Sequence, residues 1–303
     1  MSAGSATIAG VDLDIDALMR LRLLRPRSGN RKLAASPSPR PGMTMHRRRG
    51  RGLETYDVRP WSDGDDIRLL DRNVTARLGT PHVRTFQDEH GRAVLYLVDF
   101  RPSMFFGTRR AFRSVVAAEA AVFSAWRTLG LHGRVGLSAA TSNGARFFGW
   151  AASARAFPLL LSELADSHRE ALSEADGEEP PLAEAIEATE DVAGSAAMTI
   201  ATALDAPGDR LDAVVEGIAC KRKLEVLLIA DRFELAPPPG RYPYRTRGGA
   251  TGRLTIARNG GVAARDERQA CLRRLGARFL QIDAGLDMQE TALALERFDG
   301  RSF

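Results

Sequence analysis

The chain has 303 residues with ordinary hydrophobic (44%) and charged (27%) fractions, enough for one sizeable core and a small second unit. No uninterrupted apolar span reaches membrane length, since the best candidate carries Glu119, and the start of the chain lacks a basic segment followed by an apolar one, so we expect a cytoplasmic protein. The net charge of +5 at pH 7 is modest, and Cys220 and Cys271 show no metal-type spacing, which excludes a disulfide framework or a zinc site.

Residues 1–52 are predicted to form a short helix and a basic arm. Residues 12–21 place apolar side chains at helical spacing with acids in the first turn. Residues 20–51 mix arginines with Pro, Ser and Gly, and such a segment buries too little apolar surface to offset the entropy of ordering it. The arm is either a solvated linker or a contact for an acidic partner, namely nucleic acid or the anionic inner leaflet of a membrane.

Residues 53–90 predict a small strand-and-turn unit, because their apolar residues are scattered among charges and turn formers. The most distinctive feature of this unit is a group of acids with intervening arginines. These side chains either stabilise turns through ion pairs or form a docking surface for a partner. The candidate docking residues are Asp65, Asp66, Arg68 and Asp71.

Residues 91–303 are predicted to form the main domain, which is organised around its first strand. Residues 93–98, AVLYLV, are continuously apolar, as is typical of a strand buried on both faces of a sheet. Asp99 follows at the carboxyl end of that strand, where open α/β sheets bind their ligands. A turn that contains Ser103 comes next, and the spacing of apolar residues predicts a helix over residues 109–129.

The rest of the main domain alternates strands with helices. Residues 134–141 and 145–150 flank a Ser-Asn-Gly turn and predict a hairpin that adds an antiparallel edge. The other predicted elements are helices at residues 154–167, 181–190, 209–220, 261–275 and 288–298, strands at 196–201, 224–230 and 277–282, and a protruding loop or hairpin at 242–256. This order predicts an α/β fold with a doubly wound, mostly parallel sheet.

Three motifs in the same order resemble the bacterial family known as domain of unknown function fifty-eight. They are GDDIRLLD at residues 64–71, TAR at 75–77 and PSMFFGT at 102–108. The resemblance runs, with gaps, from about residue 50 to residue 303. It implies a von Willebrand factor A-like domain, in which a metal-ion-dependent adhesion site begins with Asp-x-Ser-x-Ser after the first strand.

The sequence departs from that adhesion motif at its first serine. Asp99 and Ser103 match the motif, but Arg101 stands between them where the first serine belongs. A guanidinium about 4 Å from a divalent cation would be repelled by roughly 8 kcal/mol at an effective dielectric constant near 20. We therefore expect Arg101, or water, to satisfy Asp99, and we expect the site to bind no metal.

The other two loops of the implied metal site also depart from the family pattern. The threonine expected before the LAEA helix is replaced by Pro180 and Pro181, and the strand at residues 196–201 is followed by Thr202 where the family has an acid. If a magnesium ion were bound, the resemblance implies Asp99, Ser103 and Thr202 as its ligands.

A rival alignment supplies the missing third-loop acid. The strand at residues 224–230 is stronger on propensity and ends in Asp231, which would supply the missing acid of a magnesium-dependent adhesion domain. We favour residues 196–201 as the third-loop strand, because the helix at 209–220 then fits between the two strands.

We expect a protein-interaction scaffold without catalytic activity, cofactor or small-molecule substrate. The five histidines show no paired metal spacing, Ser103 lies outside a Gly-x-Ser-x-Gly motif, and no phosphate-binding Gly-x-x-x-x-Gly-Lys motif is present. The resemblance implies a MoxR-type AAA+ ATPase and other von Willebrand A-like proteins as partners. Docking is expected at the Asp99 end of the sheet, where Arg101 would receive a partner's carboxylate. The alternative is association with nucleic acid or an anionic membrane through the basic arm.

Overall fold

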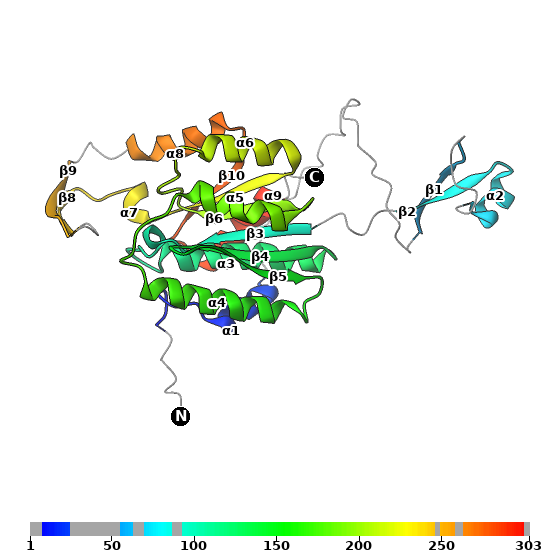
Figure 1. The fold of residues 1–303 in the computed structure, drawn as a ribbon. Helices are drawn as coiled ribbons and strands as arrows, with labels where there is room; N and C mark the ends of the chain where they lie inside the picture. Colours follow the sequence, from blue (N-terminus) through cyan, green and yellow to red (C-terminus); the bar gives the residue numbers. More distant parts are fainter. Residues whose placement is uncertain are drawn as a thin grey trace. The chain divides into compact units, whose positions relative to one another are not determined.

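A computed structural model describes residues 8–24, 55–62, 70–86, 93–245, 249–257 and 263–299. The chain divides into two compact units, and each is described by itself. The larger unit combines Met1–Gly29 with Ala93–Phe303, and the smaller unit is Asn30–Arg92. Figure 1 shows the larger unit as a sheet enclosed between two layers of helices.

A six-stranded sheet forms the centre of the larger unit, with the strand order β10-β7-β6-β3-β4-β5. Its strands are β3 (Ala93–Asp99), β4 (Arg134–Thr141), β5 (Gly144–Ala151), β6 (Ala197–Thr202), β7 (Leu224–Ala230) and β10 (Arg278–Asp283). All neighbouring strands are parallel except β4 and β5, which form an antiparallel hairpin. The predicted α/β class, with a mostly parallel sheet and one antiparallel edge strand, is confirmed. Because β6 lies between β3 and β7, it is an interior strand, as the favoured alignment expects.

Helices cover both faces of this sheet (Figure 1). One layer consists of α5 (Leu182–Ala193), α6 (Leu211–Lys221) and α8 (Ala263–Arg274), and the other of α1 (Ile15–Arg20), α3 (Arg113–Gly130), α4 (Phe157–Ser173) and α9 (Met288–Asp299). The short elements are η1 (Leu21–Leu23), η4 (Pro102–Met104) and α7 (Arg232–Leu235). Each layer encloses its own hydrophobic core against the sheet. Among the described helices, none is both long and apolar enough to cross a membrane.

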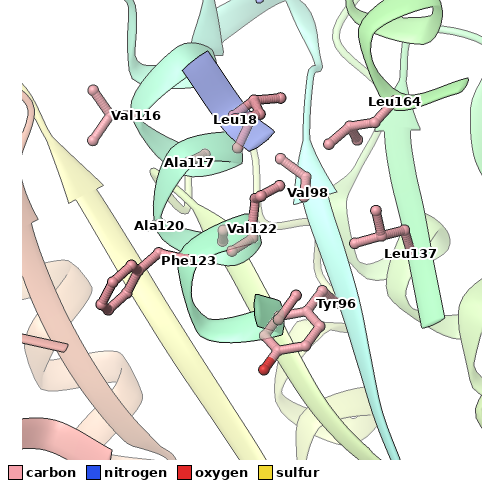
Figure 2. Packing of buried hydrophobic residues seen from close by; sticks show 14 of the residues in the cluster. Leu18, Tyr96, Val98, Val116, Ala117, Ala120, Val122, Phe123, Leu137 and Leu164 are labelled. Carbon is pink, nitrogen blue, oxygen red and sulfur yellow. The ribbon is translucent and has the colours of Figure 1, made fainter. Parts of the chain in front are cut away.

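The strand β3 contributes to both cores, which explains why its sequence does not alternate. Leu97 lies in the core with α5 and α6, whereas Tyr96 and Val98 lie in the core with α3. Figure 2 shows Tyr96 and Val98 beside α3, close to Val122. All three β3 side chains are buried, and burying such a side chain stabilises the fold by roughly 1.5–3 kcal/mol.

The helix α3 begins four residues later than predicted. Non-helical hydrogen bonds hold the preceding segment in an irregular conformation: the Phe112 amide donates to the distant Gly10 carbonyl at 2.8 Å, and the Arg113 amide donates to the Phe106 carbonyl at 2.9 Å. The amide of Thr108 is used by a carboxylate across the sheet edge. These tertiary contacts replace the helical bonds that periodicity alone predicts.

The short helix predicted near the N-terminus is α1, which packs on the main domain. Asp14 caps it by accepting from the Asp16 amide at 2.9 Å. Leu18 is buried beside α3, and its carbonyl accepts a hydrogen bond of 3.0 Å from the indole of Trp126. Most of the predicted basic arm, from residue 25 onward, lies outside the described residues.

The smaller unit contains a helix that the sequence pattern did not indicate. The strands β1 (Thr55–Pro60) and β2 (His82–Phe86) pair antiparallel, and α2 (Arg72–Leu78) lies between them in the chain. Asp71 caps α2 through a 3.0 Å bond from the Val74 amide to its carboxylate. Seven residues are too few to show a helical period, which is why the strand-and-turn prediction missed α2.

The residues predicted to form a protruding loop or hairpin fold as a hairpin. Its strands are β8 (Gly240–Arg245) and β9 (Thr251–Ile256), which form a separate two-stranded antiparallel sheet. The hairpin follows α7 and precedes α8 in the chain.

Candidate functional site

The carboxyl ends of β3 and β6 meet at one edge of the sheet and bring together two of the predicted site residues. Asp99 is the last residue of β3 and Thr202 the last of β6, and both are fully buried. The Thr202 hydroxyl donates to Oδ2 of Asp99 at 2.7 Å and accepts from the Leu204 amide at 2.9 Å. Residues about a hundred positions apart in the chain therefore share one polar cluster.

Arg101 folds back onto Asp99. Its Nε donates to Oδ1 at 3.0 Å, its Nη2 donates to Oδ2 at 2.8 Å, and its own backbone amide donates to Oδ1 at 3.0 Å. The side chain of Arg101 is 0% exposed. The result is a bidentate, completely buried ion pair, the strongest geometry that an arginine and a carboxylate can adopt.

The remaining donors of Arg101 reach two other loops. Nη1 donates to the carbonyls of Pro180 at 2.7 Å and Ala206 at 3.2 Å, and Nη2 donates to the carbonyl of Asp205 at 2.9 Å. A guanidinium has five N–H bonds, and all five of these are matched by acceptors. Arg101 thus joins the loop after β3 to the loop before α5 and the loop after β6.

The electrostatic balance favours a permanently charged Arg101. Burial by itself lowers the pKa of Arg101, but the attraction and hydrogen bonds of Asp99, with smaller contributions from Glu179 and Asp205, outweigh it. The net effect raises the pKa above its ordinary value. The site therefore contains its own fixed cation.

Ser103 binds Glu179, a residue that the sequence analysis did not single out. The Ser103 amide donates to Oε2 of Glu179 at 2.6 Å, and its hydroxyl donates to Oε1 at 2.8 Å. Oε1 also lies 3.6 Å from Nη1 of Arg101. The only sequence signal for Glu179 was its position in the acidic stretch just before the LAEA helix.

A second ion-pair group extends the network across the same edge. Arg113 donates to the Asp205 carboxylate at 2.8 Å, to Glu234 at 3.0 Å and to the carbonyl of Ser103. Arg268 of α8 donates to Glu234 at 3.3 Å and lies 3.5 Å from Asp205. Burial raises the pKa of Asp205, and Arg113 and Arg268 only partly offset that effect.

The rival alignment needs Asp231 at the end of the strand beside β3, and the structure places it elsewhere. It follows β7, which β6 separates from β3. Its carboxylate accepts from the amide and hydroxyl of Thr108 at 2.9 and 2.5 Å and from the Phe233 amide at 2.8 Å. Asp231 also forms a capping box with Glu234 at the start of α7. The Asp231 oxygens thus cap a helix and hold a loop, and the strand that Asp231 follows is not the neighbour of β3.

The residues present do not fit a divalent cation. Both Asp99 oxygens accept from the Arg101 side chain, and the guanidinium lies where a cation would need to approach. Ser103 points its hydroxyl at Glu179 instead of joining Asp99 and Thr202. Within the part of the chain that the structure describes, no group of three or more acids, histidines or cysteines is arranged to hold a metal ion.

Arg101 is also wrongly assigned as a residue that receives a partner's carboxylate. It is fully buried, and its donors are already used inside the protein. Asp71 likewise faces inward, is 8% exposed and caps α2 of the smaller unit. The other predicted docking residues of that unit, Asp65, Asp66 and Arg68, lie outside the described residues.

Comparisons with known proteins identify a family without an assigned activity. Residues 57–255, more than half of the chain, match the family described as "Protein of unknown function DUF58". Comparison with curated proteins gives no significant match. Among solved structures, the protein BatB from Bacteroides thetaiotaomicron aligns with 13% identity and a TM-score of 0.45, over 69% of this chain and 100% of that chain. An uncharacterised membrane-spanning protein from Vibrio fischeri aligns with 15% identity and a TM-score of 0.21, over 70% of this chain and 99% of that chain.

Proposed function

The chain belongs to the protein family of unknown function DUF58, and we propose that it is a non-enzymatic protein-interaction scaffold. We propose further that its larger unit is a von Willebrand factor A-like domain that docks a partner at the Asp99 end of the sheet without a metal ion. The observation that carries this proposal is the buried guanidinium of Arg101, which links three loops at that end of the sheet.

The physical reason is that Arg101 performs a structural task that a bound cation would otherwise perform. A buried ion pair is costly unless its geometry is good and every remaining donor is satisfied. Arg101 meets both conditions, since it pairs with Asp99 in bidentate fashion and its remaining donors reach backbone carbonyls. The three loops are thereby fixed before any partner arrives, which lowers the entropy cost of binding.

The exposed part of this end suits a protein partner. Phe106 is 39% exposed beside the network, and the Arg113 guanidinium lies 5.5 Å from the centre of its ring. Arg109, in the loop after β3, and Arg232, at the start of α7, are also exposed, and Arg232 pairs with Asp283 at 3.1 Å. An exposed aromatic side chain on a rigid support, with arginines nearby, is the composition of an interface hot spot.

We propose a cytoplasmic MoxR-type AAA+ ATPase as the partner, as the family resemblance implies, with assembly or maturation of other complexes as the outcome. The test is capture of that ATPase by the full chain carrying an affinity tag. Phe106→Ala should reduce the captured amount by about tenfold or more, since truncating a hot spot costs about 2 kcal/mol or more. The matched control is Leu159→Ala on α4, whose side chain is 69% exposed, and it should leave capture unchanged. Equal capture by both variants would contradict the proposed surface.

Metal independence is tested on the chain alone. Titration calorimetry with magnesium and manganese should detect no binding at micromolar concentrations. Micromolar binding that disappears in Asp99→Ala would show that the ion displaces Arg101, and the metal-free mechanism would then be rejected.

A further inference from the structure

The β8–β9 hairpin carries exposed arginines that have no partner among the described residues. Residues 235–265 contain six arginines and neither an acid nor a lysine. Three of those arginines, Arg241, Arg245 and Arg253, lie in the two strands and are exposed. Among the described residues, none of these three guanidinium groups has a hydrogen-bond or ion-pair partner. The arginines of the central site, by contrast, are all paired.

The strand register places the three arginines on one face of the hairpin. Arg241 and Arg245 are four residues apart in β8, so they point to the same side, and Arg253 of β9 lies opposite Pro243 between them. Along the strand direction the three guanidinium groups are therefore spaced by about 7 Å, the distance between alternate residues of an extended chain. This set is called the arginine face below.

The opposite face holds the hairpin's aromatic and aliphatic side chains. Tyr242 packs on Phe233 of α7 with ring centres 4.9 Å apart, and its hydroxyl donates to the Pro238 carbonyl at 2.9 Å. Tyr244 lies over Gly252, where any Cβ would come within 2.5 Å of the tyrosine hydroxyl oxygen. The hairpin is thus held at its base and stiffened by a cross-strand aromatic contact, so the arginine face is preorganised.

We propose that the arginine face binds an acidic, extended segment of a partner protein. Carboxylates on alternate residues of such a segment match the spacing of the three arginines, and each arginine is able to bind a carboxylate in bidentate fashion. Each strand of the hairpin pairs only with the other in the described part of the chain, so their outer edges offer backbone groups to an added strand. This inference rests on the proposed function only in taking the partner to be a protein.

Two other anionic partners fit the hairpin less well. A membrane would bury the side chains of Tyr244 and Leu254, which are 51% and 47% exposed. These two side chains, however, lie on the opposite face of the hairpin from the arginines that would bind the lipid headgroups. A single-stranded nucleic acid needs aromatic platforms among the basic residues, and the arginine face has Pro243 and threonines there instead.

The test is direct binding of a fluorescein-labelled peptide in which glutamate alternates with threonine, measured by anisotropy with the full chain. The control peptide has glutamine in place of glutamate. Binding to the glutamate peptide should weaken with added salt, and the triple variant Arg241→Glu, Arg245→Glu, Arg253→Glu should weaken it at least about tenfold. Glutamine replacements at the same three positions should give an intermediate loss.

A matched charge control separates local recognition from net charge. Arg77→Glu, Arg155→Glu and Arg297→Glu change three other exposed arginines by the same total charge and should leave peptide binding within about twofold. Equal binding of both peptides, or equal losses in both triple variants, would overturn the proposal. Tighter binding of phosphatidylserine vesicles or of a DNA strand through the same three arginines would overturn it as well. Because this assay contains no ATPase, its failure is distinguishable from failure of the capture experiment at Phe106.

Discussion

The edge of the central sheet and the β8–β9 hairpin both depend on arginine, and they use it in opposite ways. Arg101 is fully buried and has an acceptor for every N–H, whereas Arg241, Arg245 and Arg253 are exposed and have no described partner. The difference follows from solvation: a guanidinium removed from water needs carboxylates and carbonyls inside the protein, while an exposed one keeps its water. Buried arginine here fixes the fold, and exposed arginine is free for recognition.

The largest effect is expected from removing the buried cation. Arg101→Ala leaves Asp99 buried without its counter-charge, which should lower the free energy of unfolding by about 3–5 kcal/mol. Chemical denaturation of the variant and the native chain measures this loss. Arg101→Lys is the matched control: it keeps the charge but has three donors instead of five, so its loss should be smaller. A loss below about 1 kcal/mol in Arg101→Ala would show that the buried arginine does not stabilise the fold more than the exposed hairpin arginines do.

The next largest effect is expected at His168, because protonation of this side chain would place a charge inside the folded protein. Burial lowers the pKa of His168 to about 4, and its Nε2 is 3.0 Å from the Ser114 hydroxyl. The unfolded value is about 6.5, so the neutral form is favoured in the folded state and stability should fall as pH decreases from about 6.5 to about 4. The total loss should approach about 3 kcal/mol.

Denaturation curves at a series of pH values check this expectation. Glutamine at position 168 does not titrate, so the His168→Gln variant should show a flatter profile over that interval. Identical profiles for the variant and the native chain would exclude His168 as the source of the pH dependence.

A smaller effect is expected from Glu179, which is 16% exposed. Glu179→Ala removes two hydrogen bonds to Ser103 and one charge near Arg101, and it should cost about 1–2 kcal/mol. The neighbouring Glu178 is exposed, so Glu178→Ala serves as the control and should change stability by less than about 0.5 kcal/mol. Similar losses in both variants would mean that the contact with Ser103 is not what stabilises the loop.

The smallest effect on stability is expected at the hairpin. The variant Arg241→Glu, Arg245→Glu, Arg253→Glu removes no described contact and should unfold within about 0.5 kcal/mol of the native chain. Thermal unfolding followed by circular dichroism measures this difference. A loss comparable to that of Arg101→Ala would show that the hairpin arginines are structural after all.

Most of the fold could be predicted from local sequence patterns. The apolar run of β3, the Ser-Asn-Gly turn between β4 and β5, and the alternation of strands and helices all have short-range causes. Two features could not be predicted, for physical reasons. The helix α2 is too short to show a period, and the start of α3 is set by backbone hydrogen bonds from Phe112 to Gly10 and from Arg113 to Phe106.

Only part of the candidate site could be predicted from the sequence. The sequence identified Asp99 through its position at a strand end, and the family resemblance added Arg101, Ser103 and Thr202. It could not identify Glu179 as the partner of Ser103, because an acid in a loop has many available partners until the fold selects one. Nor could it show that Arg101 points inward, since that depends on carbonyls from two distant loops.

The sequence by itself determined the α/β class, the order of the sheet strands and long helices of the main domain, and the presence of an arginine near the strand-end acid, because hydrophobic period and turn chemistry are local. Only the tertiary structure decided which charges are neutralised inside and which remain exposed. That decision depends on burial and on acceptors supplied by segments far apart in the chain, so the same residue type is structural at position 101 and available for binding at position 253.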